Sequence, residues 1–264
     1  EWKTKWLDQG YNHNVAGRYA LVEDLDAQLG RFMKQLNAWN LMENTLVIFI
    51  TDNGPNTGGY KKDGKTHTLY HAGFSKGKGG VFEGSTRVPS FWQWKGVFEA
   101  GRDISKLTAH FDFFPTFMEL AGIKPVASTP KYEGRSLLPL FSDPQHSWAD
   151  RYLYFNTGKW EPEDDVRDYK FKSAAIRNSK YRLIWYKDEE ILLNLEEDMT
   201  NLDNIAKQHP EIVKTMKAEY EKWWEGVYPH ASKTLPPVVE QQWEKAFYQL
   251  RKPEVAPTYE VPAL

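Results

Sequence analysis

A short, uninterrupted apolar run, followed at once by polar residues, constrains this chain more than any other feature. Residues 45–50 read TLVIFI, and residues 51–55 read TDNGP. An unbroken β-branched and apolar run predicts a strand that is buried on both faces, as in a parallel sheet. Before it, apolar residues recur every three or four positions from Val15 to Leu36, which predicts a helix of about six or seven turns ending near Asn40. A long helix, a buried strand and polar residues at the strand's carboxyl end indicate an α/β fold.

The second half of the chain has a different pattern, in which short candidate strands precede one helix. The candidate strands are residues 152–155, 173–177, 181–186 and 191–195. Pro210 predicts the first turn of a helix that Gly226 ends. We therefore expect a small antiparallel sheet packed on a helix. The expected units are residues 1–140, part of a larger α/β domain; residues 141–228, a small α+β subdomain; and residues 229–264, an extension that wraps the surface.

Composition excludes several classes of protein. The chain has 264 residues, and its 34 basic and 36 acidic residues give a net charge of −2, which argues against a general nucleic-acid binder. No stretch approaches the roughly 18 apolar residues of a membrane span. The absence of cysteine excludes disulfides, thiolate metal sites and a cysteine nucleophile from this chain. Because the chain begins with neither a Met nor a signal peptide, we expect a fragment, a processed product or part of a split protein.

Asp52 and Asn53 are the first candidates for chemistry. A carboxylate and an amide oxygen after a buried strand are hard ligands that suit Ca²⁺ or Mg²⁺. The alternative is a simple turn, because Asn-Gly-Pro is typical turn sequence.

A Gly- and Lys-rich loop over residues 56–86 holds the remaining candidates. Lys76 and Lys78 lie in FSKGKGG, where glycines let the backbone approach an anion and lysine supplies positive charge. The spacing does not match a Walker loop, and a solvated loop is the alternative. His67 and His71 are candidate acids, bases or substrate contacts, or else ordinary surface residues.

Five motifs, taken in order, resemble the C-terminal half of the formylglycine-dependent sulfatases, in the alkaline-phosphatase-like superfamily. They are residues 19–30 (YALVEDLDAQLG), 44–55 (NTLVIFITDNGP), 77–89 (GKGGVFEGSTRVP), 110–116 (HFDFFPT) and 133–139 (EGRSLLP). Residues 195–202 (LEEDMTNL) are similar to the closing sheet motif of that family. The resemblance runs from about residue 14 to 225. It implies part of an alkaline-phosphatase-like sandwich with a mostly parallel sheet.

The resemblance also implies roles for single residues. Asp52 and Asn53 match the second pair of calcium ligands, with magnesium as the less favoured ion. Lys78 matches the catalytic lysine that contacts the sulfate and the bridging oxygen. The loop between Pro55 and Gly73 looks longer than in the family, so His67, His71 and Lys76 are carried only as substrate-pocket candidates.

The family's nucleophile motif, Cys- or Ser-x-Pro-Ser-Arg, does not occur in this sequence. The family's first metal-binding aspartates and its catalytic histidines are also not matched. We therefore expect the formylglycine to lie in an absent N-terminal part, which would be a partner of this chain. A secreted or periplasmic location is expected from the resemblance.

The expected function is hydrolysis of the sulfate ester of a sulfated carbohydrate or an aryl sulfate. One alternative is a phosphodiesterase or phosphonate hydrolase of the same superfamily. Another is a non-catalytic glycan-binding fragment, because 15% of the residues are aromatic and 11 are Trp. In that case Trp160 is a candidate for stacking on a sugar, with ordinary packing as its alternative.

Overall fold

The structure, a computed structural model, describes residues 2–56, 58–74, 76–126, 132–161, 163–197, 200 and 203–231. The α-helices are α1 (Trp2–Asp8), α2 (His13–Ala38), α3 (Glu83–Thr86), α4 (Phe113–Leu120), α5 (Leu138–Ser142) and α6 (Pro210–Val227). The strands are β1 (Val47–Ile50), β2 (Gly59–Lys62), β3 (Lys65–Thr68), β4 (Ser90–Gln93), β5 (Leu153–Asn156), β6 (Ala174–Arg177), β7 (Tyr181–Tyr186) and β8 (Glu189–Asn194). Most of the predicted extension, residues 232–264, lies outside the described residues.

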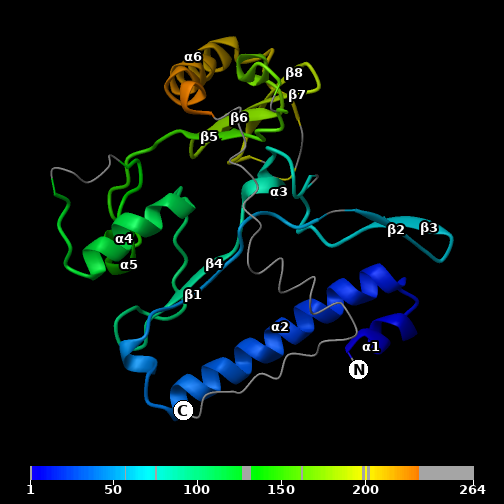
Figure 1. The fold of residues 1–264 in the computed structure, drawn as a ribbon, viewed down its shortest axis with the longest axis vertical. Coiled ribbons are helices and arrows are strands. Elements are labelled where there is room, and N and C mark those ends of the chain that lie inside the picture. Colours follow the sequence, from blue (N-terminus) through cyan, green and yellow to red (C-terminus); the bar gives the residue numbers. More distant parts are fainter. Residues whose placement is uncertain are drawn as a thin grey trace.

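The predicted long helix is confirmed as α2. It begins after Asn12, whose side chain accepts hydrogen bonds from the amides of Asn14 and Val15. Its apolar stripe is only partly buried, because α1 lies beside its first half while the rest runs along the edge of the molecule (Figure 1). Leu25 and Phe32 are about half exposed. Among the described residues, no helix has the combination of length and apolar sequence that crossing a bilayer requires.

The apolar run after α2 forms β1, which pairs antiparallel with β4 from Val47↔Gln93 to Ile50↔Ser90. All four residues of β1 are only half-buried, so the prediction of a strand buried on both faces was wrong for this structure. The physical reason is that, among the described elements, none but β4 makes extensive contact with β1, so no helix or second sheet covers the faces of the pair. Every strand pairing in the described part of the chain is antiparallel, so the mostly parallel sheet is not confirmed.

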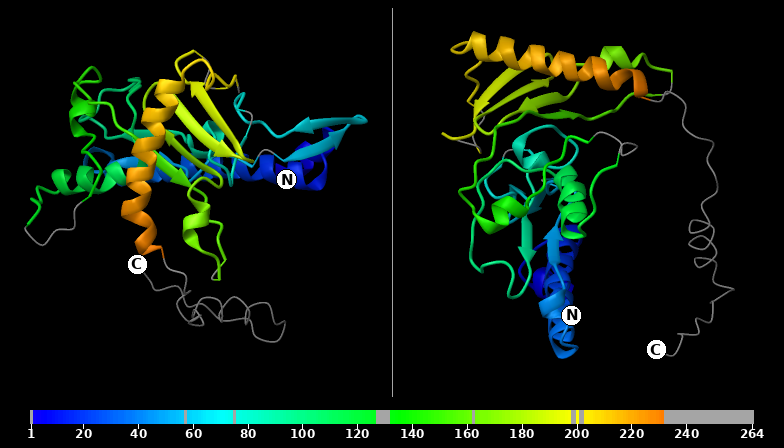
Figure 2. Two further views of the ribbon diagram at one scale, coloured as in Figure 1. Left: turned by 90° about the horizontal axis from the view of Figure 1, so that it is seen from above. Right: turned by 90° about the vertical axis from the view of Figure 1, so that its left-hand side faces the viewer.

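The predicted small antiparallel sheet is confirmed, with the strand order β5-β6-β7-β8. Both of its faces are covered. One face packs on α6 through a core that includes Ile176, Leu183 and Tyr220 (Figure 2). The other face packs on Val81 and Phe82, which lie just before α3. The sheet therefore joins the C-terminal helix to the segment that contains the candidate lysines.

The loop predicted over residues 56–86 contains a hairpin of β2 and β3. Its two-residue turn is Asp63-Gly64, with φ angles of 51° and 73°. Two positive φ angles are typical of the type I′ turn, which fits the right-handed twist of a hairpin. The hairpin projects beside α1 and the beginning of α2, where the Tyr60 ring lies 5.8 Å from the ring of Tyr11 (Figure 1).

Candidate functional site

Asp52 and Asn53 lie in the loop directly after β1, and this loop contacts the backbone of α3. The amide of Gly54 donates a hydrogen bond to the carbonyl of Ser85 at 2.9 Å. A Cβ atom on Gly54 would lie 1.9 Å from the carbonyl oxygen of Gly84, so only glycine allows this approach. A direct backbone contact therefore fixes the position of the two candidate ligands.

Lys78 belongs to the loop before α3, and its backbone is bonded to the same β1 loop. Its amide donates to the carbonyl of Pro55 at 2.8 Å, while its side chain is exposed. The two glycines that follow Lys78 line the same pocket as Asp52 and Asn53. The structure thus brings the Lys78 loop together with the candidate metal ligands, although Lys78 itself is not among the residues that line the pocket.

The segment after Lys78 is anchored to the small sheet by Arg182 of β7. This guanidinium is fully buried and donates to the carbonyl of Val81, with Nε at 2.9 Å. Its Nη1 atom lies 2.7 Å from the carboxylate of Glu83, the first residue of α3. Arg182 therefore joins the sheet to both ends of the short segment 81–83.

Glu83 is the centre of a buried charge cluster. Besides Arg182, the guanidinium of Arg177 lies 2.7 Å from its carboxylate and that of Arg87 lies 3.5 Å away. Desolvation acts to raise the pKa of Glu83, but Coulomb attraction to Arg182, Arg177 and Arg87 outweighs it and holds that pKa below its usual value. The carboxylate is thus ionised at neutral pH and binds α3 to the small sheet.

His110 is a further residue beside the candidate ligands. Its Nε2 atom lies 2.9 Å from the carbonyl oxygen of Thr51. Because a carbonyl oxygen only accepts hydrogen bonds, Nε2 is the donor in this contact. His110 therefore supports the backbone next to Asp52 and lines the same pocket.

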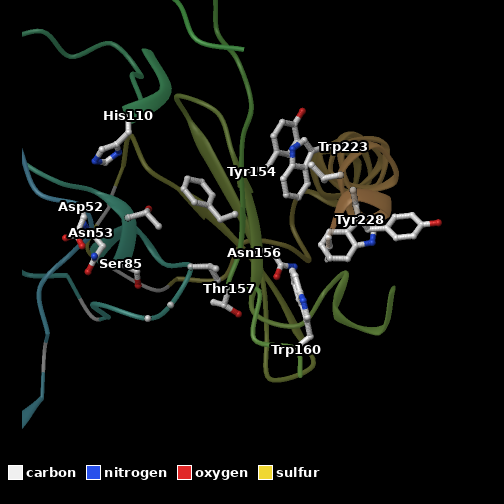
Figure 3. A pocket seen from close by; sticks show the side chains of 18 residues that line it. Asp52, Asn53, Ser85, His110, Tyr154, Asn156, Thr157, Trp160, Trp223 and Tyr228 are labelled. Carbon is white, nitrogen blue, oxygen red and sulfur yellow. Dashed lines mark hydrogen bonds between the residues drawn. The ribbon is translucent and has the colours of Figure 1, made fainter. Parts of the chain in front are cut away.

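A pocket of about 550 Å³ extends from Asp52 and Asn53 to the small subdomain (Figure 3). Figure 3 shows the two ligand candidates, Ser85 and His110 on one side of β5. Aromatic side chains lie on the other side, where β5 meets α6. These aromatic residues are Tyr154, Trp160, Trp223, Trp224 and Tyr228. The pocket therefore has a polar end and an aromatic end.

The two histidines predicted as substrate contacts do not line this pocket. His67 is exposed on β3, and its ring stacks on the ring of Tyr60 at 5.5 Å. His71 follows the hairpin, and its Nε2 lies 3.2 Å from Oγ1 of Thr68. Neither is brought together with Asp52, so a substrate role for either residue stays a prediction.

Lys76 also lies away from the pocket lining. Its Nζ atom is 5.8 Å from the ring centroid of Phe82 and 5.9 Å from that of Tyr186. These distances are typical of a cation–π contact, which holds the ammonium group over the side of the small sheet. A substrate contact by Lys76 likewise remains a prediction.

Sequence reasoning missed most of the pocket wall that the small subdomain contributes. Asn156 and Thr157 line the pocket, and Nζ of Lys159 donates to the carbonyl of Gly79 at 3.3 Å. The available signal was a polar run with a glycine directly after a predicted strand, ending at Trp160. Gly158 has a φ of 61° and packs under the Trp160 ring, which marks this run as a shaped turn.

The donors at Asp52 and Asn53 are of the kind that calcium binds. Calcium takes six to eight oxygen ligands, and the two side chains are oxygen donors on adjacent residues. Within the described part of the chain, no group of three or more His, Cys, Asp or Glu side chains is placed to hold a metal. The two residues therefore fit a calcium ion chemically as part of a larger set of oxygen ligands.

Comparison with protein families gives two matches that overlap along the chain. The family described as "Sulfatase" matches residues 3–123. The family described as "N-sulphoglucosamine sulphohydrolase, C-terminal" matches residues 71–225, which is more than half of the chain.

Individual proteins agree with this result. Steryl-sulfatase of Homo sapiens is 30% identical over 164 residues, covering 60% of this chain and 28% of that protein. The uncharacterized sulfatase YdeN of Escherichia coli (strain K12) is 27% identical over 241 residues, covering 81% of this chain and 41% of that protein.

A crystal structure of Ps i-CgsB in complex with k-i-k-neocarrahexaose has a TM-score of 0.66 and 24% identity, and the likeness covers 94% of this chain and 50% of that chain. At that identity the likeness concerns the fold alone. This chain spans half or less of the length of each of the three proteins. It matches the sulfatase families along most of its described length, and it therefore belongs to the sulfatase family, of which it represents a C-terminal portion.

Proposed function

We propose that this chain provides part of the active site of a sulfuric ester hydrolase that acts on sulfated carbohydrates or aryl sulfates. The observation that carries the proposal is the meeting of two loops at one pocket. Asp52 and Asn53 approach from β1, and the segment that begins with Lys78 approaches from the small sheet. The two segments are bonded backbone to backbone, at Gly54 and at Lys78.

Lys78 is the proposed catalytic residue. A sulfate monoester is an anion, so a nucleophile that approaches it meets negative charge. The Lys78 ammonium would neutralise oxygens of the sulfate and donate a hydrogen bond to the bridging oxygen as the S–O bond breaks. Removing one such electrostatic contact typically costs about 10²–10³ in rate. Its side chain is exposed, and its backbone is bonded to the loop that holds Asp52 and Asn53.

Asp52 and Asn53 are the proposed calcium ligands, with magnesium as the less favoured ion. Two adjacent oxygen donors at one end of the pocket support this assignment. When bound, the ion would supply positive charge for the sulfate oxygens. The Gly54 contact and the His110 hydrogen bond would hold both donors in position without any change in the loop.

The formylglycine nucleophile is proposed to lie in an N-terminal portion that completes the site. Two features of the described residues support such a partner. The residues of β1 are only half-buried, most of those of β4 are exposed, and among the described residues each strand has an unpaired edge, as expected of strands taken from a larger sheet. The middle of α2 also exposes apolar side chains such as Leu25. A larger domain that includes residues 1–140 would cover both surfaces, with residues 141–228 as the subdomain beside it.

The nature of the substrate and the location of the protein extend the same proposal. The similar structure of Ps i-CgsB in complex with k-i-k-neocarrahexaose supports a carbohydrate substrate. The likeness to steryl-sulfatase supports the alternative that the substrate is a smaller sulfate ester. His67, His71 and Lys76 remain candidates for contacts to a long substrate. A secreted or periplasmic location is proposed on family membership alone.

The proposal is tested with a protein that joins this chain to an upstream sulfatase portion. Sulfate release from 4-nitrophenyl sulfate is measured for the parent, Lys78→Ala and Lys95→Ala. Lys95 is an exposed lysine whose Nζ lies 3.7 Å from the carboxylate of Glu43, and among the described residues its backbone makes no bond to the β1 loop, so its variant is a matched control. We expect Lys78→Ala to lose about 10²–10³ in kcat and the control to keep full rate. Undiminished turnover by Lys78→Ala, or preference for 4-nitrophenyl phosphate, contradicts the proposal.

A further inference from the structure

The aromatic end of the pocket has no part in the sulfate chemistry proposed above. Trp160 follows β5, whereas Trp223, Trp224 and Tyr228 come from the end of α6 and the residues after it. Trp160 and Trp223 are only partly buried, so they present ring surface to the pocket. A sulfate group needs no aromatic surface, because it is held by charge and hydrogen bonds. Something larger than the sulfate group is required to explain this wall.

We propose that the aromatic end of the pocket is a subsite for a sugar ring next to the sulfated sugar, and that this enzyme therefore acts on an oligosaccharide or polysaccharide sulfate. The inference rests on the proposed function, because it places the sulfate group at the Asp52–Asn53 end. The C–H face of a pyranose ring packs on indole and phenol rings, and its hydroxyls need polar partners around the rim. The lining of this pocket provides both kinds of group.

An unused hydrogen-bond donor gives a second, independent reason. Trp224 is 3% exposed, and among the described residues no acceptor lies within hydrogen-bonding distance of its Nε1 atom. A buried indole N–H usually finds a partner, because leaving it unpaired is unfavourable. Trp224 lines the pocket, but its Nε1 atom is closed to solvent, so the indole ring would have to turn toward the pocket for an oxygen of a bound sugar to accept this hydrogen bond.

The strand between the two ends also suits an extended ligand. Within the described residues, β5 pairs only with β6, so its other edge carries backbone N–H and C=O groups that no strand uses. Asp52 and Asn53 lie on one side of this strand, and Trp160 and Tyr228 lie on the other (Figure 3). A ligand that reaches from the sulfate end to the aromatic end must cross the edge of β5.

The test measures binding, so that it does not depend on turnover. The full chain is titrated by calorimetry with a sulfated hexasaccharide, with the same hexasaccharide after desulfation, and with 4-nitrophenyl sulfate. We expect both hexasaccharides to bind. Trp160→Ala should weaken both by about 3- to 10-fold, and Trp160→Phe should recover most of the loss because it keeps an aromatic face. Trp39→Ala is the matched control, since Trp39 is 62% exposed and lies at the end of α2.

Two results would overturn the subsite. One is failure of both hexasaccharides to bind, and the other is equal affinity of Trp160→Ala and the parent chain. A synthetic peptide of residues 232–264 that binds in trans while the hexasaccharides do not would assign the aromatic end to the chain's own C-terminal segment instead. The proposed function can fail without the subsite failing. If the chain binds the desulfated hexasaccharide through Trp160 but the joined protein releases no sulfate, the subsite is retained and the hydrolase activity is rejected.

Discussion

The guanidinium of Arg182 and the carboxylate of Glu83 lie 2.7 Å apart, with Arg182 fully buried and Glu83 3% exposed. This pair connects the small sheet to the segment that follows Lys78. Breaking a buried ion pair by removing one charge is costly, because the other charge stays in a poorly solvated position. Removing the charge of Glu83 should cost more than removing one partner of a simple pair, because Arg177 would lose the same carboxylate as Arg182.

We therefore predict that Glu83→Gln lowers the free energy of unfolding by about 3–5 kcal/mol. Urea denaturation followed by tryptophan fluorescence measures the change. Glu99→Gln serves as the control, because Glu99 is 66% exposed and its pair with Arg102 lies at the surface, and it should change stability by less than about 1 kcal/mol. A Glu83→Gln protein as stable as the control variant would show that the cluster contributes little.

The same carboxylate predicts how stability depends on pH. The folded pKa of Glu83 lies below its usual value of 4.5, so the unfolded chain binds a proton at a higher pH than the folded chain does. The stabilisation is therefore fully present above the unfolded pKa and is lost as the pH falls through the folded pKa. The stability gap between the parent and Glu83→Gln should be constant near pH 7 and should narrow below about pH 4.5. A gap that is independent of pH down to pH 3 would contradict this assignment.

The elements of the fold were largely predictable, but their pairing was not. The 3.6-residue periodicity of α2 and the apolar run of β1 are local signals, and both elements form where they were expected. Whether β1 is buried on both faces depends on which other elements pack over the sheet, and no local pattern encodes that. The hairpin of β2 and β3 was missed although Asp63-Gly64 is a strong turn signal, because its strands are rich in Lys and Thr and lack apolar alternation.

The candidate site divides in the same way. Asp52, Asn53 and Lys78 were chosen from short motifs, and the structure brings their loops together. The opposite wall, with Asn156 and Trp223, comes from residues far along the chain and depends on how the small sheet packs on Val81. One local signal did point to this packing. Arg182 lies inside the buried strand β7 and so requires a buried partner charge, which is Glu83.

Two glycines give a matched test of the contact between the β1 loop and α3. In Gly54→Ala the added Cβ would lie 1.9 Å from the Gly84 carbonyl oxygen, so the two backbones must separate. We expect a loss of about 1–3 kcal/mol in unfolding free energy, together with loss of sulfate release in the joined protein. In Gly30→Ala the added Cβ meets nothing within 4 Å in the middle of α2, and it should stabilise the protein by about 0.5–1 kcal/mol. Equal effects of the two substitutions would show that the Gly54 contact is not required.

Calcium binding is predicted to stabilise the joined protein through Asp52. A ligand that binds only the folded state adds about 2.7 kcal/mol when its concentration is 100 times the Kd, so EDTA should lower the Tm of the parent. Asp52→Asn removes one negative charge at the ligand position. In this variant EDTA should therefore no longer lower the Tm. Asp63→Asn is the matched control, because Asn-Gly serves the type I′ turn of the hairpin as well as Asp-Gly does and Asp63 does not line the pocket. A calcium response that survives in Asp52→Asn would place the ion elsewhere, whereas a response lost equally in both variants would point to a general effect of charge.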